Sequence, residues 1–212
     1  MPNIDFTQVF IVFAILLLSL TIHEAAHAWS ADRLGDSTAR RLGRVSFNPM
    51  VHVDPIGTIL FPLIALTTGL PILGWAKPVP VNVQQLGPSW KQKFMAIAAA
   101  GPASNILIAV VCSIALRVME ASASEGGGAV GLAGAVLVMA IRLNVLLAVF
   151  NMLPIPPLDG GNVVAGLLHG RAAQAFDGLR AYGFIILYAL MFSGILWQLI
   201  TPPEEFFLSW LL

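Results

Sequence analysis

The stretch FTQVFIVFAILLLSLTIHEAAHAW, residues 6–29, decides the fold class and carries the most informative motif of the chain. Its core, from Val9 to Leu20, contains one serine and no charged residue. A helix needs about 20 mostly apolar residues to cross the hydrocarbon core of a bilayer. The stretch therefore predicts a transmembrane helix, and ionisable residues near its end stand where charge is costly.

The composition of the whole chain also indicates a protein embedded in a lipid bilayer. Of its 212 residues, 58% are hydrophobic and 10% are charged, and the mean hydropathy is +0.84. Soluble domains carry about 25% charged residues. Eleven Lys and Arg balance eleven Asp and Glu, so no net positive charge attracts nucleic acid. The single cysteine, Cys112, excludes an internal disulfide and a cysteine-based zinc finger.

Three more apolar stretches are long enough to cross a bilayer. They are residues 94–118, residues 130–152, which lead into a proline-rich segment ending at 160, and residues 181–200, which Pro202 and Pro203 are expected to terminate. We therefore expect an all-α polytopic membrane protein with four strong spans. The 212 residues are expected to form a single membrane-embedded domain.

Residues 45–90 do not fit this pattern. Apolar residues 56–73 are interrupted by prolines and glycines, and residues 74–82 (GWAKPVPVN) carry prolines at alternate positions, which favours extended backbone. Non-helical backbone at membrane depth must be covered by protein or line a cavity. We predict a membrane-associated insertion made of a short helix and an extended hairpin, giving four to six spans in total.

The distribution of basic residues predicts the orientation. Cytoplasmic loops are enriched in Lys and Arg. Basic residues follow the first span, precede the second, and separate the third from the fourth, whereas residues 121–129 contain none. These basic residues are Arg33, Arg40, Arg41, Arg44, Lys91, Lys93, Arg171 and Arg180. The N-terminus and residues 121–129 are therefore expected outside the cell membrane.

The first span contains the motif His23-Glu24-Ala-Ala-His27. On a helix, residues four apart stand on one face, so the two imidazoles can bind one zinc ion. Glu24 can reach a water on that ion, as in metalloproteases with the H-E-x-x-H pattern. His23 lies about 26 Å along the helix from Phe6, so the metal is expected inside the membrane profile, nearer the cytoplasm.

Catalytic zinc usually has three protein ligands and one open position. Asp54 and Asp159 are the acids that remain once those on the outer side and in distant loops are set aside. Asp159 ends the segment NMLPIPPLD, residues 151–159, at the cytoplasmic end of the third span and at the depth of His23. Its three prolines unwind the helix and free backbone groups to meet a substrate.

His-Glu-Ala-Ala-His in a first transmembrane helix, with Asn-Met-Leu-Pro-Ile-Pro-Pro-Leu-Asp-Gly in a later one, resembles the site-2 protease family of intramembrane zinc metalloproteases. Gly101-Pro-Ala-Ser-Asn105 matches a third, looser motif of that family. The resemblance implies one zinc ion held by His23, His27 and Asp159, with Glu24 as the catalytic base. It also implies a minimal catalytic core, since these residues contain no stretch like the PDZ or CBS domains of other members.

Three asparagines are candidates to contact the substrate backbone or the developing oxyanion. Asn105 and Asn151 are the stronger candidates, and Asn144 is the third. Each could instead form a hydrogen bond between helices in the membrane.

The segment from Lys77 to Val83 is expected to reach the active site. Its prolines keep it extended, so Val79 and Val81 could present an edge to which an unwound substrate pairs. The alternative is a structural plug that covers the site.

The function expected from these residues is intramembrane zinc endoproteolysis of single-span membrane proteins, as in regulated intramembrane proteolysis. The location expected is a prokaryotic inner membrane. Two alternatives stay open: a transporter or channel that uses a buried metal-ligand cluster, and a catalytically inactive binding protein of the same family. Neither alternative needs Glu24, whereas a protease does.

Overall fold

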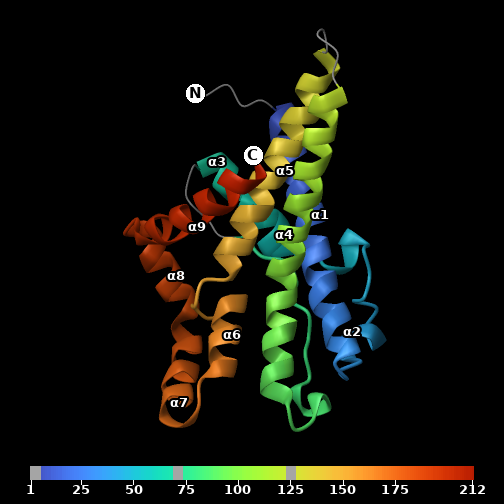
Figure 1. The fold of residues 1–212 in the computed structure, drawn as a ribbon. Coiled ribbons are helices and arrows are strands. Elements are labelled where there is room, and N and C mark those ends of the chain that lie inside the picture. Colours follow the sequence, from blue (N-terminus) through green and yellow to red (C-terminus); the bar gives the residue numbers. More distant parts are fainter. Residues whose placement is uncertain (1–5, 69–73, 123–127) are drawn as a thin grey trace.

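The computed structural model describes residues 6–68, 74–122 and 128–212, and its regular elements there are helices (Figure 1). Three long helices form the centre: α1 (Phe6–Arg33), α4 (Trp90–Ser122) and α5 (Gly128–Asn151). α4 packs against both α1 and α5. Within these described ranges, four helices are long and apolar enough to cross a membrane, so the prediction of an all-helical protein with four spans is confirmed.

The end of α1 is set by a glycine. Gly35 has a φ of 115°, which side-chain-bearing residues rarely adopt. The N–H of Asp36 donates to the carbonyl of Ala31 and that of Gly35 to Asp32, as in a Schellman motif. The chain then turns into the short helix α2 (Thr38–Arg41) beside α1.

The insertion after α2 is helical at first and then extended. It contains the short turns η1 (Pro49–Val51) and η2 (Pro55–Leu60), the helix α3 (Phe61–Thr68) and, before α4, the turn η3 (Val83–Leu86). Residues 74–82 are extended, and they form no β-ladder with other described residues. Four N–H groups of this segment, those of Trp75, Lys77, Val79 and Asn82, donate instead to the carbonyls of Gly57 and His52 and to the carboxylates of Glu24 and Asp36.

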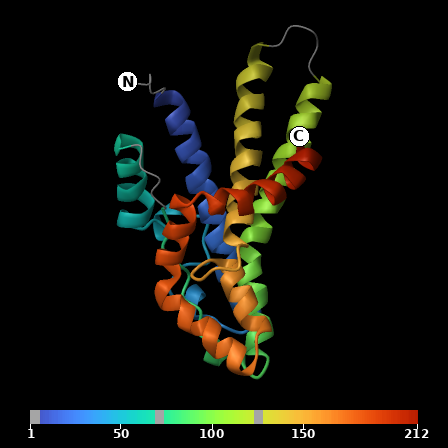
Figure 2. The same ribbon diagram turned by 90° about the vertical axis from the view of Figure 1, so that its left-hand side faces the viewer.

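After α5, the proline-rich segment leads into a row of shorter helices. These are α6 (Asp159–Leu167), α7 (Gly170–Gly178), η4 (Leu179–Tyr182), α8 (Gly183–Phe192) and α9 (Ile195–Leu211). α6 packs against α4, and α9 packs against α5 (Figure 2).

The fourth span differs from its predicted limits of 181–200. The apolar helical run covers Gly170–Phe192 and breaks at Gly194, whose φ of 78° favours glycine. Pro202 and Pro203 lie inside α9 and do not end it. A proline removes one helical N–H donor, whereas the left-handed glycine redirects the chain, and Figure 2 shows α9 crossing the bundle rather than continuing along it.

Two groups of buried apolar residues hold these elements together. The larger one joins α4, α5, α8 and α9, and Ile141, Val145, Leu187 and Leu196 are almost completely buried in it. The smaller one consists of Ala31, Leu86 and Ile97, and it fixes the end of the extended segment between α1 and α4. The predicted outer loop, residues 121–129, lies partly outside the described residues.

Candidate metal centre

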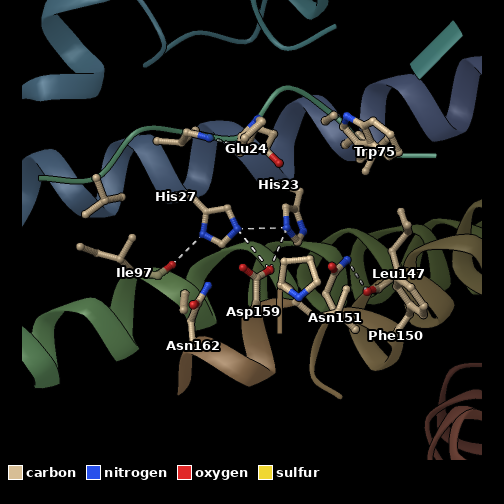
Figure 3. A pocket seen from close by; sticks show the side chains of 18 of the residues that line it. His23, Glu24, His27, Trp75, Ile97, Leu147, Phe150, Asn151, Asp159 and Asn162 are labelled. Carbon is tan, nitrogen blue, oxygen red and sulfur yellow. Dashed lines mark hydrogen bonds and ion pairs between the residues drawn. The ribbon is translucent and has the colours of Figure 1, made fainter. Parts of the chain in front are cut away.

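His23 and His27 lie one turn apart on α1, and both side chains point toward Asp159, the first residue of α6 (Figure 3). The Nε2 atoms of the two histidines are 3.0 Å apart. They lie 3.1 Å (His23) and 3.3 Å (His27) from Oδ2 of Asp159. Both histidines are buried, with 4% and 8% of their surfaces exposed.

A chain of hydrogen bonds fixes the orientation of His23. Nδ2 of Asn144 donates to the carbonyl of Ala140, so Oδ1 of Asn144 must face Asn105 and accept from its Nδ2 at 2.9 Å. Oδ1 of Asn105 then faces Nδ1 of His23 at 2.6 Å, and the imidazole must donate. The proton on Nδ1 leaves Nε2 to point its lone pair toward Asp159.

His27 is fixed in the same way by the backbone of α4. Its Nδ1 lies 2.7 Å from the carbonyl of Ile97, which can only accept. Gly101 lets α4 come this close, because a Cβ there would lie 2.4 Å from Nε2 of His27 and 2.5 Å from Nε2 of His23. Gly101 and Asn105 stand one turn apart, so one face of α4 supports both imidazoles.

Asp159 reaches the histidines because the backbone before it folds tightly. A Cβ on Gly160 would lie 2.2 Å from the carbonyl oxygen of Met152, so only glycine permits this approach. The carboxylate form of Asp159 is the one that ligates metals.

These three donor atoms fit a zinc ion. Neighbouring ligands of a tetrahedral ion with bonds of about 2.0 Å are about 3.3 Å apart, close to the separations of 3.0, 3.1 and 3.3 Å seen here. Three acceptors at such distances repel one another unless a cation, a proton or a metal ion, lies between them. Two neutral imidazoles and one carboxylate form a donor set that suits zinc.

Glu24 is separate from this donor set and lies beside it. Its Oε2 accepts a hydrogen bond of 3.2 Å from the backbone N–H of Val79, which fixes one carboxylate oxygen. The extended segment therefore reaches the site, as the sequence predicts. The other oxygen is left to act on a water or a substrate group.

A cavity of about 600 Å³ opens on the metal centre. Val79, Val81 and Asn151, all predicted to contact substrate, line its wall. Asn105, also predicted there, is fully buried and bonded to His23 and Asn144, so its contacts favour orienting the ligand over binding substrate.

Asn162 is a cavity residue that sequence reasoning missed. It lies one turn after Asp159 on α6 and lines the cavity (Figure 3). Its Oδ1 accepts a hydrogen bond of 3.0 Å from Arg180. That bond turns the amide NH₂ away from Arg180. The spacing of three residues from Asp159 on one helix is the signal that could have found it.

Asp54, the other acid that the sequence left open as a ligand, is occupied elsewhere. Its Oδ1 accepts from the N–H groups of Ile56 and Gly57 and caps η2. Nε2 of His52 faces the carbonyl of Ser46 at 2.9 Å. Neither side chain belongs to the cluster of His23, His27 and Asp159.

The comparisons with known proteins agree with this geometry. The chain is 34% identical over 196 residues to "Putative zinc metalloprotease YwhC" of Bacillus subtilis, covering 90% of this chain and 85% of that protein. A model of peptidase family M50 matches residues 120–193, which include Asp159. The chain belongs to peptidase family M50. This is the site-2 protease family that the motifs resemble, and the chain is a zinc metalloprotease of that family.

Other M50 relatives are mycobacterial. The chain is 29% identical over 197 residues to "Putative zinc metalloprotease Rip2" of Mycolicibacterium smegmatis, covering 91% of this chain and 71% of that protein. It is 30% identical over 191 residues to "Putative zinc metalloprotease Rip3" of Mycobacterium tuberculosis, covering 85% of this chain but 37% of that longer protein. No solved structure matches with significance. These named relatives are all bacterial, and the family assignment favours a protease over the transporter alternative.

Proposed function

We propose that this protein is an intramembrane endopeptidase that hydrolyses peptide bonds within or near the transmembrane segments of single-span membrane proteins. The observation that carries the proposal is the convergence of His23, His27 and Asp159 beside Glu24, partway along an apolar helix of 28 residues. A peptide bond must enter the membrane profile to reach such a site. The 212 residues would form one catalytic domain.

Under this proposal, His23, His27 and Asp159 hold the zinc ion. Zinc bound there supplies a Lewis acid that polarises the scissile carbonyl and acidifies the attacking water. Glu24 takes the proton of that water and delivers it to the leaving amine. Asn105 keeps His23 in the tautomer that binds metal, through the hydrogen bond of 2.6 Å.

The substrate contacts follow from the groups that face the cavity. The amide NH₂ of Asn162, oriented by Arg180, can donate to a substrate carbonyl or to the developing oxyanion. Asn151 uses its NH₂ on the carbonyl of Leu147, which leaves its Oδ1 as an acceptor on the cavity wall.

From Lys77 to Pro80 the extended segment offers the substrate carbonyl acceptors rather than N–H donors. The N–H groups of Lys77 and Val79 already donate to His52 and Glu24, and Pro78 and Pro80 have none. A substrate that pairs with this edge must therefore supply its own N–H groups. A helix does so only after it unwinds, so we expect helix instability to govern recognition.

The test compares two single-span fusion proteins in proteoliposomes, which differ only by a Gly-Pro pair in the span. Zinc-loaded wild-type protein should cleave the destabilised span faster. Glu24→Gln should retain zinc yet lose activity by about two to four orders of magnitude, the usual contribution of a general base. Asp159→Ala should lose both zinc and activity. Cleavage by Glu24→Gln at the wild-type rate would overturn the proposal, and zinc binding without cleavage by wild type would favour the inactive alternative.

A further inference from the structure

Arg44 is a buried cation that the chemistry described above does not use. It follows α2, and 5% of its surface is exposed. Gly43, with a φ of 69°, turns the chain there, and the backbone N–H of Arg44 donates to the carbonyl of Ala39. Lys and Arg are almost never fully buried unless paired, so the position of this guanidinium requires an explanation.

The guanidinium of Arg44 is directed at the extended segment. Its Nη2 donates to the carbonyl of Lys77 and lies 3.4 Å from that of Pro78. The next residue, Val79, donates its N–H to Oε2 of Glu24. The Lys77 carbonyl that Arg44 binds and the Val79 N–H that Glu24 binds therefore belong to two adjacent peptide units.

Other bonds hold the segment at points farther from Glu24. The N–H of Trp75 donates to Gly57, that of Lys77 to His52, and that of Asn82 to Oδ2 of Asp36. Between Lys77 and Asn82, two of the four residues are prolines without an N–H. A side-chain donor that binds carbonyls is well suited to holding this stretch, because prolines keep their carbonyls.

Arg44 and Glu24 also act on each other through space. Burial lowers the pKa of the Arg44 guanidinium, and the nearby carboxylate of Glu24 opposes that shift. Arg44 and Glu24 thus contact the same extended segment, Arg44 at its carbonyl groups and Glu24 at an N–H group.

We propose that Arg44 is a positioning residue for Glu24: it holds the backbone at Lys77 and Pro78 so that the N–H of Val79 fixes the Glu24 carboxylate beside the metal centre. The inference rests on the proposed function in that Glu24 is the base. Arg44 does not touch the metal ligands or line the cavity. Its loss therefore affects the chemical step more than substrate binding.

The test uses Arg44→Met, which keeps the apolar stem and removes every donor, and Arg44→Lys, which keeps one charged donor group. Arg41→Met, which removes an exposed arginine of α2, is the matched control. Hydrogen–deuterium exchange of the peptide spanning residues 74–86 reports the segment without any substrate. We expect the amides of Lys77 and Val79 to exchange about tenfold faster or more in Arg44→Met than in wild type. Their exchange rate in Arg44→Lys should lie between these two, and that in Arg41→Met should equal wild type.

Kinetics on the destabilised single-span substrate give the second readout. Arg44→Met should lower kcat about tenfold or more and change KM by less than about threefold, and Arg44→Lys should recover part of kcat. Zinc content shows whether each variant keeps its metal centre. If Arg44→Met loses zinc, Arg44→Lys carries the test in both assays.

Two outcomes would overturn the inference. One is unchanged exchange at Lys77 and Val79 in a zinc-retaining Arg44→Met. The other is a rise in KM at constant kcat, which would show that Arg44 supports only the pairing of the segment with substrate and does not position Glu24. A wild-type protein that cleaves neither fusion would instead contradict the proposed function, and the exchange experiment would still decide whether Arg44 holds the segment.

Discussion

Oδ1 of Asn105 accepts a hydrogen bond of 2.6 Å from Nδ1 of His23, although 82 residues separate them in the chain. The bond belongs to a network that ends at Ser19 of α1 and at a backbone carbonyl of α5. Because that carbonyl can only accept, the direction of every bond in the network is determined. α1, α4 and α5 therefore all contribute to holding one imidazole in its metal-binding tautomer.

Replacement of Asn105 by leucine should weaken zinc binding by about 10- to 100-fold, the usual effect of losing the partner of a ligating histidine. Leucine has a similar size but leaves Nδ1 of His23 buried without an acceptor. Zinc affinity is measured by competition with a chelator. Ser104→Ala, one position earlier on α4, is the control, since Ser104 bonds only its own helix at Gly101. Equal affinities for Asn105→Leu and wild type would show that the network does not orient His23.

The close approach of α4 predicts that Gly101→Ala abolishes zinc binding. Its Cβ would lie 2.4 Å from Nε2 of His27, so helix and imidazoles must separate. Gly131→Ala on α5 is the control, because no atom lies within 4 Å of a Cβ there. Zinc content and thermal unfolding in detergent are both measured. A Gly101→Ala protein with full zinc content would contradict this packing argument.

His52 predicts a pH dependence of stability. Burial lowers the pKa of His52 below 6.5, and the nearby Arg44 adds to this, whereas the Ser46 carbonyl and Glu24 oppose it. In the unfolded chain the histidine takes up a proton as pH falls through 6.5, while the folded protein resists protonation. The stability that neutral His52 contributes is therefore full above about pH 6.5 and is lost as pH falls below it.

The measurement is thermal unfolding of wild type and His52→Gln at about pH 7.5 and 5.5, a range that brackets the histidine pKa. The loss of stability at the lower pH should be smaller in His52→Gln. His169→Gln, at an exposed histidine, should behave like wild type. Acid acts equally on the metal ligands of all three proteins, so identical losses would exclude a role for His52.

The basic loops predict an orientation with the N-terminus outside. In a Cys112→Ser background, Ala121→Cys should react with a membrane-impermeant maleimide in intact cells. Ser37→Cys and Ala181→Cys should react only after lysis. External labelling of Ser37→Cys would reverse the orientation and place the metal centre toward the outer face.

The sequence predicted the spans well where the signal was local. The helix that begins at residue 6 and the two that follow the insertion appear with somewhat longer limits, because hydropathy identifies the membrane-crossing part and not the helix ends. The fourth span was misplaced, because the prolines at 202–203 are the more obvious helix-ending signal, whereas the helix breaks at Gly194. The contacts of the extended segment were not predicted, because alternating prolines indicate extended backbone without identifying its hydrogen-bond partners.

By itself the sequence determined that the chain is a membrane protein and that His23, Glu24 and His27 share one stretch of helix, since composition and a four-residue spacing are local properties. It left Asp54 and Asp159 both open as the third ligand until the family motif was considered. Only the tertiary structure placed Asp159 against the histidines, put Asn105 behind one of them and brought Val79 to Glu24. These pairs are separated by 55 or more residues, and packing at glycines such as Gly101 and Gly160, which no local pattern encodes, brings them together.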